Sequence, residues 1–230
     1  MGEQRATEAG SGPDGRGPVG GPSFVRDFLR RYILAILCGV GLALAFPTYH
    51  LYPLAWFVLT PLIRQSLTLP PRAAAARSLV AGFAFHLVLL QWLLSNVYWA
   101  GGWAWWGYVG ISFLLALFWF VAAAIWAHAA INVKWLPVEI TLPLTWGAME
   151  YVQSFAFTGF GWSAIAYSQA SDLWLAQWAA IGGAPLVSAI VVACNTLLAK
   201  AWLHKRLRAA RCATRRGKAR CWQSSCCSCS

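Results

Sequence analysis

The chain has 230 residues, of which 59% are hydrophobic and only 11% are charged, and it contains 15 tryptophans. Soluble domains carry roughly a quarter charged residues, whereas tryptophan concentrates at membrane–water interfaces. The composition excludes an ordinary soluble domain and predicts an all-α, polytopic membrane helix bundle.

The net charge of +11 does not indicate a nucleic-acid-binding protein, because of where the positive residues lie. About half of the lysines and arginines fall between Lys200 and Arg220, and most of the others flank apolar segments. No nucleic-acid-binding motif accompanies them. Cytoplasmic loops of membrane proteins carry such charges, and they attract anionic lipid headgroups. We therefore expect membrane lipids, and no nucleic acid, as partners.

Three parts follow one another along the chain. Residues 1–23 are polar and rich in glycine and proline, so they cannot bury enough apolar surface to fold, and we expect them to be disordered. Residues 24–203 form a predicted six-helix transmembrane domain. Residues 204–230 form a basic, cysteine-rich tail that we also expect to be disordered.

Six apolar segments occupy the predicted transmembrane domain. Each approaches or exceeds the roughly 20 residues that are needed to cross a bilayer. Prolines end or interrupt several of them, and Pro61 predicts a kink in the second. The predicted spans cover residues 28–46, 54–69, 78–98, 105–131, 138–155 and 173–203.

The positive charges predict how the spans are oriented. With a cytoplasmic N-terminus, the loops 70–77 and 131–137 and both tails face the cytoplasm, and they hold the lysines and arginines that lie outside the span ends. The opposite loops, near 47–53, 98–104 and 155–172, contain neither residue. The number of spans and the charge distribution therefore agree on two cytoplasmic termini.

Four ionisable residues lie in or near the predicted spans: His86, His128, Glu139 and Glu150. A charge within the bilayer is costly, so each is a candidate functional residue. We expect the histidines to be neutral and bonded to neighbouring helices, and Glu139 to pair with Lys134. Glu150 shares a helix face with Trp146 and Gln153, where it is either a buried hydrogen-bond anchor or part of a substrate cavity.

Familiar catalytic and metal-binding patterns do not occur. The four histidines do not have the spacing of a metal site. No Ser-His-Asp order, HExxH motif, phosphate-binding loop or nucleotide fingerprint is present. The sequence therefore predicts no metal, no cofactor and no catalytic residue.

The most specific pattern follows the fifth predicted span, where FTGFGW at residues 157–162 precedes AYSQ at residues 166–169. It resembles the FTGFPW…GYSQ signature of the apolipoprotein N-acyltransferases, with Gly161 in place of proline. Three other blocks resemble the family in the same order, over roughly residues 33–200: LALAFPTYHLYPLAWFVLTPL (42–62), AGFAFHLVLLQWL (81–93) and LPLTWGAMEY (142–151).

The resemblance implies an activity and a location. Members of the family lie in the bacterial inner membrane and transfer an acyl chain from a phospholipid to the α-amine of the diacylglyceryl cysteine that begins a lipoprotein. The acyl group passes through a thioester on a cysteine of a Glu-Lys-Cys set, which belongs to a periplasmic nitrilase-like domain. Phospholipid and lipoprotein are therefore the substrates that the resemblance implies.

The sequence departs from the family after the sixth predicted span. No nitrilase-like domain follows, so none of the seven cysteines takes the role of nucleophile, and we expect a truncated membrane portion that is not catalytic alone. The tail is typical of a reading-frame change, although palmitoylation or metal binding would also use its cysteines. A lipid-binding subunit of a split acyltransferase, and a small transporter or scaffold, are the alternative functions.

Position indicates which residues would contact substrate. The loop after the fifth span faces the periplasmic interface in the predicted topology, where a headgroup and an acyl ester would meet the nucleophile. The alternative is that these side chains only fix the loop. The candidate substrate-binding residues are Thr158, Phe160, Trp162, Tyr167 and Gln169, with Glu150 beside them.

Overall fold

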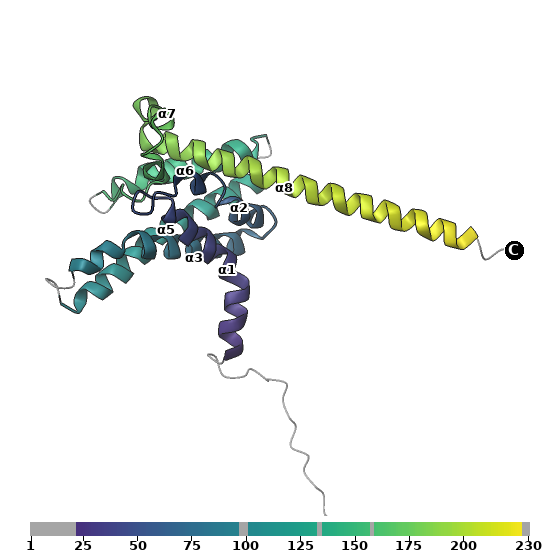
Figure 1. Ribbon diagram of the computed structural model, residues 1–230, viewed down its shortest axis with the longest axis horizontal. Coiled ribbons are helices and arrows are strands. Elements are labelled where there is room, and N and C mark those ends of the chain that lie inside the picture. The colour runs from purple at the N-terminus through teal and green to yellow at the C-terminus, as the bar shows by residue number, and fades with distance from the viewer. Residues whose placement is uncertain (1–21, 97–100, 133–134, 157–158, 227–230) are drawn as a thin grey trace, which may run out of the picture. The chain divides into compact units, whose positions relative to one another are not determined.

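The computed structural model describes residues 22–96, 101–132, 135–156 and 159–226, and no strand occurs among them. The chain divides into two units, residues 1–32 and 33–230. The packing described below lies within the second unit. The helices, shown in Figure 1, are α1 (Pro22–Leu44), η1 (Tyr52–Trp56), α2 (Thr60–Ser66), α3 (Pro71–Leu89), η2 (Gln91–Asn96), α5 (Trp103–Asn132), α6 (Val138–Gln153), η4 (Ile165–Gln169), α7 (Leu173–Ala176) and α8 (Ala179–Cys226).

The prediction of an all-α membrane protein is confirmed for the described residues, but the count of six spans is not. Three helices are long and apolar enough to cross a bilayer: Pro71–Leu89, Trp103–Ala130 and Ala179–Leu207. The predicted second span is two short helices, η1 and α2. Each of them has a proline in its first turn, which ends one helix and begins the next.

The sixth predicted span is also broken. It begins with the four-residue helix α7, and α8 is kinked at Gly182 and Gly183, whose backbone angles are not helical. Gly183 has a φ of 68°, a conformation that glycine adopts without strain.

The backbone of α8 continues as a helix past residue 203 to Cys226, which differs from the disordered tail expected from residue 204. Alanine, leucine, lysine and arginine are all good helix formers, and they make up most of residues 199–211. The division of the chain at residue 204, with a separate basic and cysteine-rich tail after it, stays a prediction. The side chains from residue 208 onward lie outside the described part.

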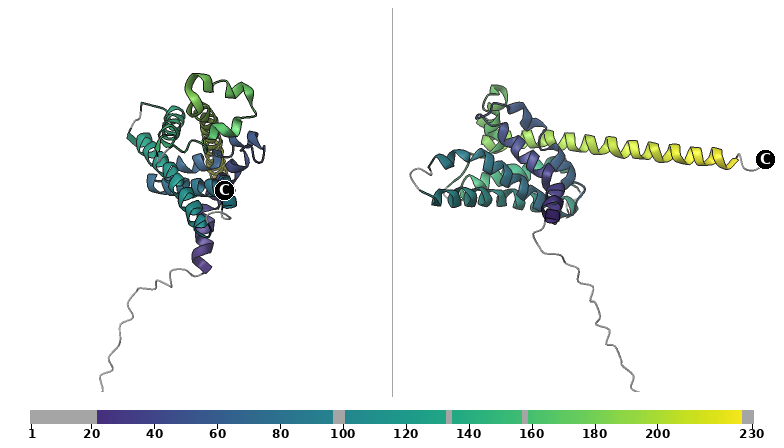
Figure 2. Two further views of the ribbon diagram at one scale, coloured as in Figure 1. Left: turned by 90° about the vertical axis from the view of Figure 1, so that its left-hand side faces the viewer. Right: turned by 60° about the horizontal axis from the view of Figure 1, so that its bottom comes forward.

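The helices α3 and α5 form an antiparallel pair, and the two lie side by side in Figures 1 and 2. Gly82 lets α5 approach closely, because a Cβ atom there would lie 2.7 Å from Cγ of Trp119. Gly39 does the same for α1, where a Cβ atom would lie 2.1 Å from the carbonyl oxygen of Ala81. Small residues at helix contacts are typical of membrane bundles.

Buried Asn195 of α8 joins that helix to the broken segment η1–α2. Its Oδ1 accepts hydrogen bonds from the N–H of Leu59 (3.1 Å) and the hydroxyl of Thr60 (3.2 Å), and its Nδ2 donates to the carbonyl of Ala55 (2.8 Å). Backbone groups freed by a helix break inside a membrane need such partners. One side chain thus bridges the N–H of Leu59 and the carbonyl of Ala55, two groups that would bond to each other in a continuous helix.

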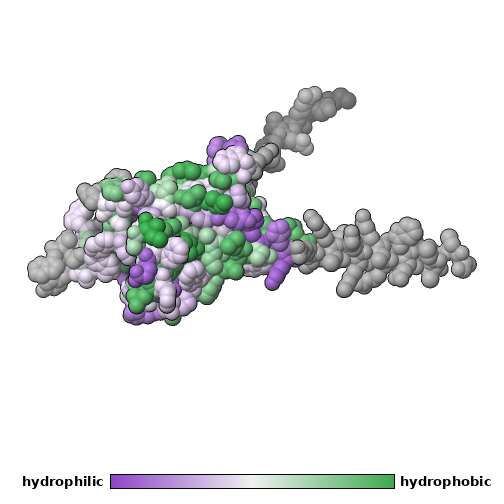
Figure 3. Space-filling view, turned by 90° about the horizontal axis from the view of Figure 1, so that it is seen from above, coloured by the Kyte–Doolittle hydropathy of each residue, from purple (hydrophilic) through white to green (hydrophobic). Residues whose placement is uncertain are grey.

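The surface is unusually apolar. Figure 3 shows apolar residues on the outside, separated by small groups of hydrophilic ones. Only 33% of the apolar window of α5 is buried, so most of its hydrophobic side chains, including Phe113 and Ile125, point outward. A water-exposed surface of this kind would be unfavourable, and a bilayer accounts for it.

The close approach at Gly39 generates a prediction. Gly39→Ala is expected to lower the free energy of unfolding by about 1–3 kcal/mol, because the new methyl group meets backbone atoms that cannot move independently. Gly110→Ala in α5 is the control, since nothing lies within 4 Å of its Cβ position. The control should leave stability unchanged or raise it by up to about 1 kcal/mol. Thermal unfolding in detergent measures both, and equal stability of the two variants would contradict the packing.

Candidate functional site

The segment between α6 and α7 contains most of the predicted site, and the backbone of its residues 159–164 is not helical. We call residues 159–169 the anchored loop, because buried side chains hold it at several points. Its backbone needs hydrogen-bond partners where it contacts apolar helices.

Glu150 of α6 holds the middle of the anchored loop. Its Oε1 accepts hydrogen bonds from Nε1 of Trp146 (2.8 Å) and from the backbone N–H of Ile165 (3.0 Å). The Ser188 hydroxyl interacts with the same carboxyl group and accepts a hydrogen bond from the N–H of Ala166 (2.9 Å). Glu150 thus connects α6, the loop and α8.

The other carboxyl oxygen of Glu150 faces different surroundings. Oε2 is buried and makes no hydrogen bond of normal geometry with the described residues. Glu150 lines a small cavity together with Trp119, Gln153 and Ser163. The cavity has room for about one water molecule, which would supply the missing partner.

Gln153, one helical turn after Glu150, holds the start of the anchored loop. Its Nε2 donates to the hydroxyl of Ser163 (2.7 Å) and to the carbonyl of Phe160 (3.3 Å). The backbone N–H of Phe160 donates in return to the carbonyl of Gln153 (3.3 Å). The sequence indicated Gln153 only through the face that it shares with Glu150.

Gln169 holds the end of the anchored loop against η1. It is fully buried, and its Oε1 accepts a hydrogen bond from Nε1 of Trp56 (3.0 Å). Its Nε2 donates to the carbonyl of Tyr52 (3.1 Å) and to the hydroxyl of Ser168 (2.9 Å). Both ends of the amide are occupied, so Gln169 joins two segments that lie more than a hundred residues apart in the chain.

The same loop exposes aromatic rings. Trp162 is 65% exposed, and its ring stacks on Trp92 of η2 with centroids 5.8 Å apart. The ring centroid of Phe160 lies 6.1 Å from that of Trp162. Phe160 also packs against a buried cluster of Leu90, Tyr108 and Leu115. Trp92, Phe160 and Trp162 form what we call the aromatic cluster. Tyr167 is 46% exposed farther along the loop.

The structure therefore divides the predicted site residues into two groups. Phe160, Trp162 and Tyr167 present aromatic surface, whereas Glu150 and Gln169 are internal anchors. Thr158 lies outside the described residues. The sequence did not single out Ser163, Ser188, Trp56 and Trp92, because their partners lie in other elements, whose contacts sequence spacing does not show.

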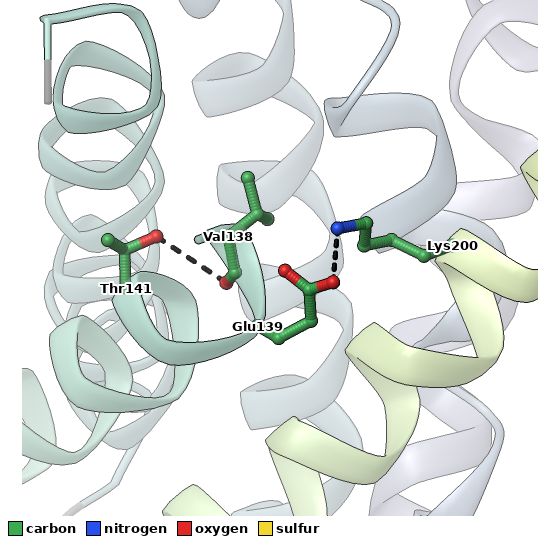
Figure 4. A network of polar contacts seen from close by, with 4 residues as sticks. All are labelled: Val138, Glu139, Thr141 and Lys200. Atoms are coloured by element: carbon green, nitrogen blue, oxygen red, sulfur yellow. Dashed lines mark hydrogen bonds and ion pairs between the residues drawn. The ribbon is translucent and has the colours of Figure 1, made fainter. Parts of the chain in front are cut away.

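The opposite end of the bundle carries charge. Glu139, at the start of α6, pairs with Lys200 of α8, as Figure 4 shows. The expected partner was Lys134, which lies outside the described residues. The actual pair joins two helices that pack along each other, so its members are 61 residues apart.

The histidines differ from the expectation as well. Nδ1 of buried His86 bonds to the carbonyl of Gly82, one turn earlier in its own helix, at 2.7 Å. Its Nε2 has no partner among the residues that the structure describes. His128 is exposed on α5. No group of three or more metal-ligating side chains occurs in the described ranges.

These features define a class of protein: a helical membrane domain that presents a loop of exposed aromatic residues on buried polar anchors. Residues 38–197 match the family described as the apolipoprotein N-acyltransferase N-terminal domain. The match covers more than half of the chain, and the chain belongs to this family.

Curated relatives agree with this assignment. The chain is 32% identical to the apolipoprotein N-acyltransferase of Geobacter metallireducens over 171 residues, which are 74% of this chain and 33% of the relative. It is 30% identical to that of Gloeobacter violaceus and 31% identical to that of Vibrio parahaemolyticus, in each case over 77% of this chain and 36% of the relative. The chain thus spans about a third of the length of the relatives it matches.

The anchoring role of Glu150 can be measured. Glu150→Ala leaves the N–H groups of Ile165 and Trp146 without their acceptor, at a cost of about 1–3 kcal/mol for each buried group. We expect a clearly lower melting temperature than for Glu150→Gln, which keeps an acceptor oxygen. His128→Ala, at an exposed position, is the control and should melt like the wild type. A Glu150→Ala variant as stable as the control would show that the carboxylate does not hold the loop.

Proposed function

We propose that this chain forms the membrane domain of an apolipoprotein N-acyltransferase and holds the phospholipid acyl donor against the aromatic cluster. The observation that carries the proposal is the contrast within the anchored loop. Gln169 of the loop and Glu150, which binds the loop from α6, are directed inward, whereas Trp162 and Tyr167 of the loop are exposed. A loop fixed in this way offers a preformed surface.

The chemistry of the exposed residues suits a phospholipid. The faces of Trp162 and Phe160 are apolar and would pack against acyl chains. The hydroxyl of Tyr167 would donate to a headgroup or ester oxygen, because tyrosine combines an apolar ring with a polar end. Glu150, Gln153 and Gln169 act as positioning residues in this proposal.

The proposed location is the bacterial inner membrane, with the anchored loop at the periplasmic face. Support comes from the charges at the two ends of the bundle. The end that holds the anchored loop has no lysine or arginine in residues 155–172. The other end holds Arg64, Arg77 and Lys200, as expected for a cytoplasmic face.

We further propose that this segment contributes no catalytic nucleophile. The cysteines whose side chains the structure describes are Cys38, buried in α1, and Cys194, half-buried in α8, and both suit helix packing. The acyl transfer would belong to a Glu-Lys-Cys set of the family, on the same polypeptide or on a partner chain. A transporter is less well supported, because the cavities beside Trp126 and Glu150 have room for only a few water molecules, and the larger hollow lined by Ile125 and Leu144 is open at the surface.

A chimaera tests this function directly. Residues 38–197 would replace the matching segment of the Geobacter metallireducens relative, in a strain that depends on the chimaera for lipoprotein N-acylation. We expect the chimaera to restore N-acylation, as measured by mass spectrometry of a lipoprotein N-terminus. Trp162→Ala should lower the rate by about tenfold through lost lipid contact.

The matched control is Trp135→Ala, because Trp135 is 82% exposed but lies between α5 and α6, away from the anchored loop. It should leave the rate unchanged. A chimaera that inserts into the membrane and stays inactive, while the unaltered relative is active, would contradict the proposed function. Equal losses for the two tryptophan variants would contradict the role of the aromatic cluster.

A further inference from the structure

Three segments that lie far apart in the sequence meet at the end of the bundle that carries the anchored loop. They are the turn after α1 (residues 47–53), η2 and the anchored loop itself. Trp92 of η2 stacks on Trp162 of the loop, and Nε2 of Gln169 in the loop donates to the carbonyl of Tyr52 in the turn. A third contact joins the turn to η2, so each segment touches both of the others.

The third contact involves a tyrosine hydroxyl. Nε2 of Gln91 donates a hydrogen bond to the hydroxyl oxygen of Tyr49 (2.6 Å). A hydroxyl group that accepts a hydrogen bond still has its own proton to donate, and the residues that the structure describes supply no acceptor for it. Tyr49 is 38% exposed, so this donor is available to a molecule outside the protein.

The backbone holds Tyr49 in place. The N–H groups of Tyr49 and His50 both donate to the carbonyl of Phe46 (2.9 and 3.1 Å), which closes a tight turn after α1. His50 has a φ of 57°, a conformation that is strained for a residue other than glycine. The bond from Gln169 to Tyr52 fixes the other end of the turn. The hydroxyl is thus positioned before a ligand binds, which lowers the entropic cost of binding.

The same hydroxyl lies close to the aromatic cluster. Gln91 and Trp92 are neighbours on η2, and both side chains are exposed. The lengths of the glutamine side chain and of one backbone step place the Tyr49 hydroxyl at most about 12 Å from Cα of Trp92. A phospholipid with two chains spans this distance. A lipid whose chains pack on the aromatic cluster therefore has its glycerol unit within reach of Tyr49.

The surface that the three segments form is neutral. Residues 47–53, 91–96 and 159–169 contain no aspartate, glutamate, lysine or arginine. They offer a phosphate group no cationic partner, whereas an ester carbonyl is a neutral acceptor that suits a hydroxyl donor. Ester groups lie between the hydrocarbon chains and the headgroups of a bilayer, at the level where tryptophan and tyrosine rings gather.

We propose that the Tyr49 hydroxyl donates a hydrogen bond to an ester carbonyl oxygen of the phospholipid, and that Gln91 is a positioning residue that orients this hydroxyl. The inference rests on the proposed function, because the lipid is the acyl donor held against the aromatic cluster. It adds a polar contact from the turn after α1, which lies outside the anchored loop. This contact holds the ester group, which is the part of the lipid that reacts, at a constant place beside the aromatic cluster.

Lipid analogues test which atom the hydroxyl contacts. The full chain, purified in detergent, is titrated with dipalmitoylphosphatidylcholine and with its dihexadecyl ether analogue, which lacks both carbonyl oxygens. Native mass spectrometry measures the dissociation constant of the first bound lipid. We expect the wild type to bind the ester about fivefold more tightly than the ether, as one neutral hydrogen bond allows. Tyr49→Phe removes only the hydroxyl and should abolish this preference.

Two further variants assign the effect to the pair. Gln91→Leu should reduce the preference for the ester, and it should cause no further loss when combined with Tyr49→Phe, because Gln91 acts through the hydroxyl. Tyr151→Phe is the matched control. Tyr151 is 58% exposed on α6, its ring contacts Phe155, and it lies outside the three segments. The control should keep the full preference.

Several results would overturn the proposal. A wild type that binds ester and ether equally would remove the contact. Equal losses for both lipids in Tyr49→Phe would place the hydroxyl on the headgroup instead, and additive losses in the double variant would remove the role of Gln91.

Trp162→Ala separates this inference from the proposed function, because it should weaken the binding of both lipids alike. If it does so while Tyr49→Phe keeps the preference for the ester, the contact with Tyr49 fails and the proposed function stands. Unchanged binding of both lipids by Trp162→Ala would contradict the proposed function itself.

Discussion

The central constraint on this structure is that backbone outside a helix must find hydrogen-bond partners in an apolar environment. Two of the breaks in its helices are the segment η1–α2 and the anchored loop. Asn195 and Gln169 bond to backbone groups of the first break, and Glu150 and Gln153 bond to those of the second. Because Glu150 and Gln153 belong to α6, and Asn195 to α8, satisfying the backbone also fixes how these two helices meet the broken segments.

This constraint separates two roles within one short stretch of sequence. The side chains of Glu150, Gln153, Ser163 and Gln169 are directed inward, where they hold the loop, and the rings of Trp162 and Tyr167 remain exposed. The Trp162–Trp92 stack then joins the loop to the end of α3 through η2. Such an arrangement suits a domain that positions lipid for chemistry performed by other residues, as proposed for this member of the family.

The sequence predicted the class of fold and the region of the site, but not the anchors. Length and hydropathy indicated the apolar segments, and the FTGFGW motif indicated the loop. The count of six continuous spans is not confirmed, because hydropathy alone does not show that the prolines of residues 52–62 divide one apolar block into the short helices η1 and α2. The pairing of Glu139 with Lys200, like the bond between Gln169 and Trp56, joins helices whose contact sequence spacing does not reveal.

Hydrogen exchange of the wild-type chain in lipid nanodiscs tests the central claim most directly. The amides of Ile165 and Ala166 donate to Glu150 and Ser188. The account predicts that they exchange about as slowly as amides within α3, although the adjoining residues 159–164 form an irregular loop and Trp162 is exposed. Exchange as fast as in an unprotected loop would contradict the account, because the aromatic cluster would then have no fixed support.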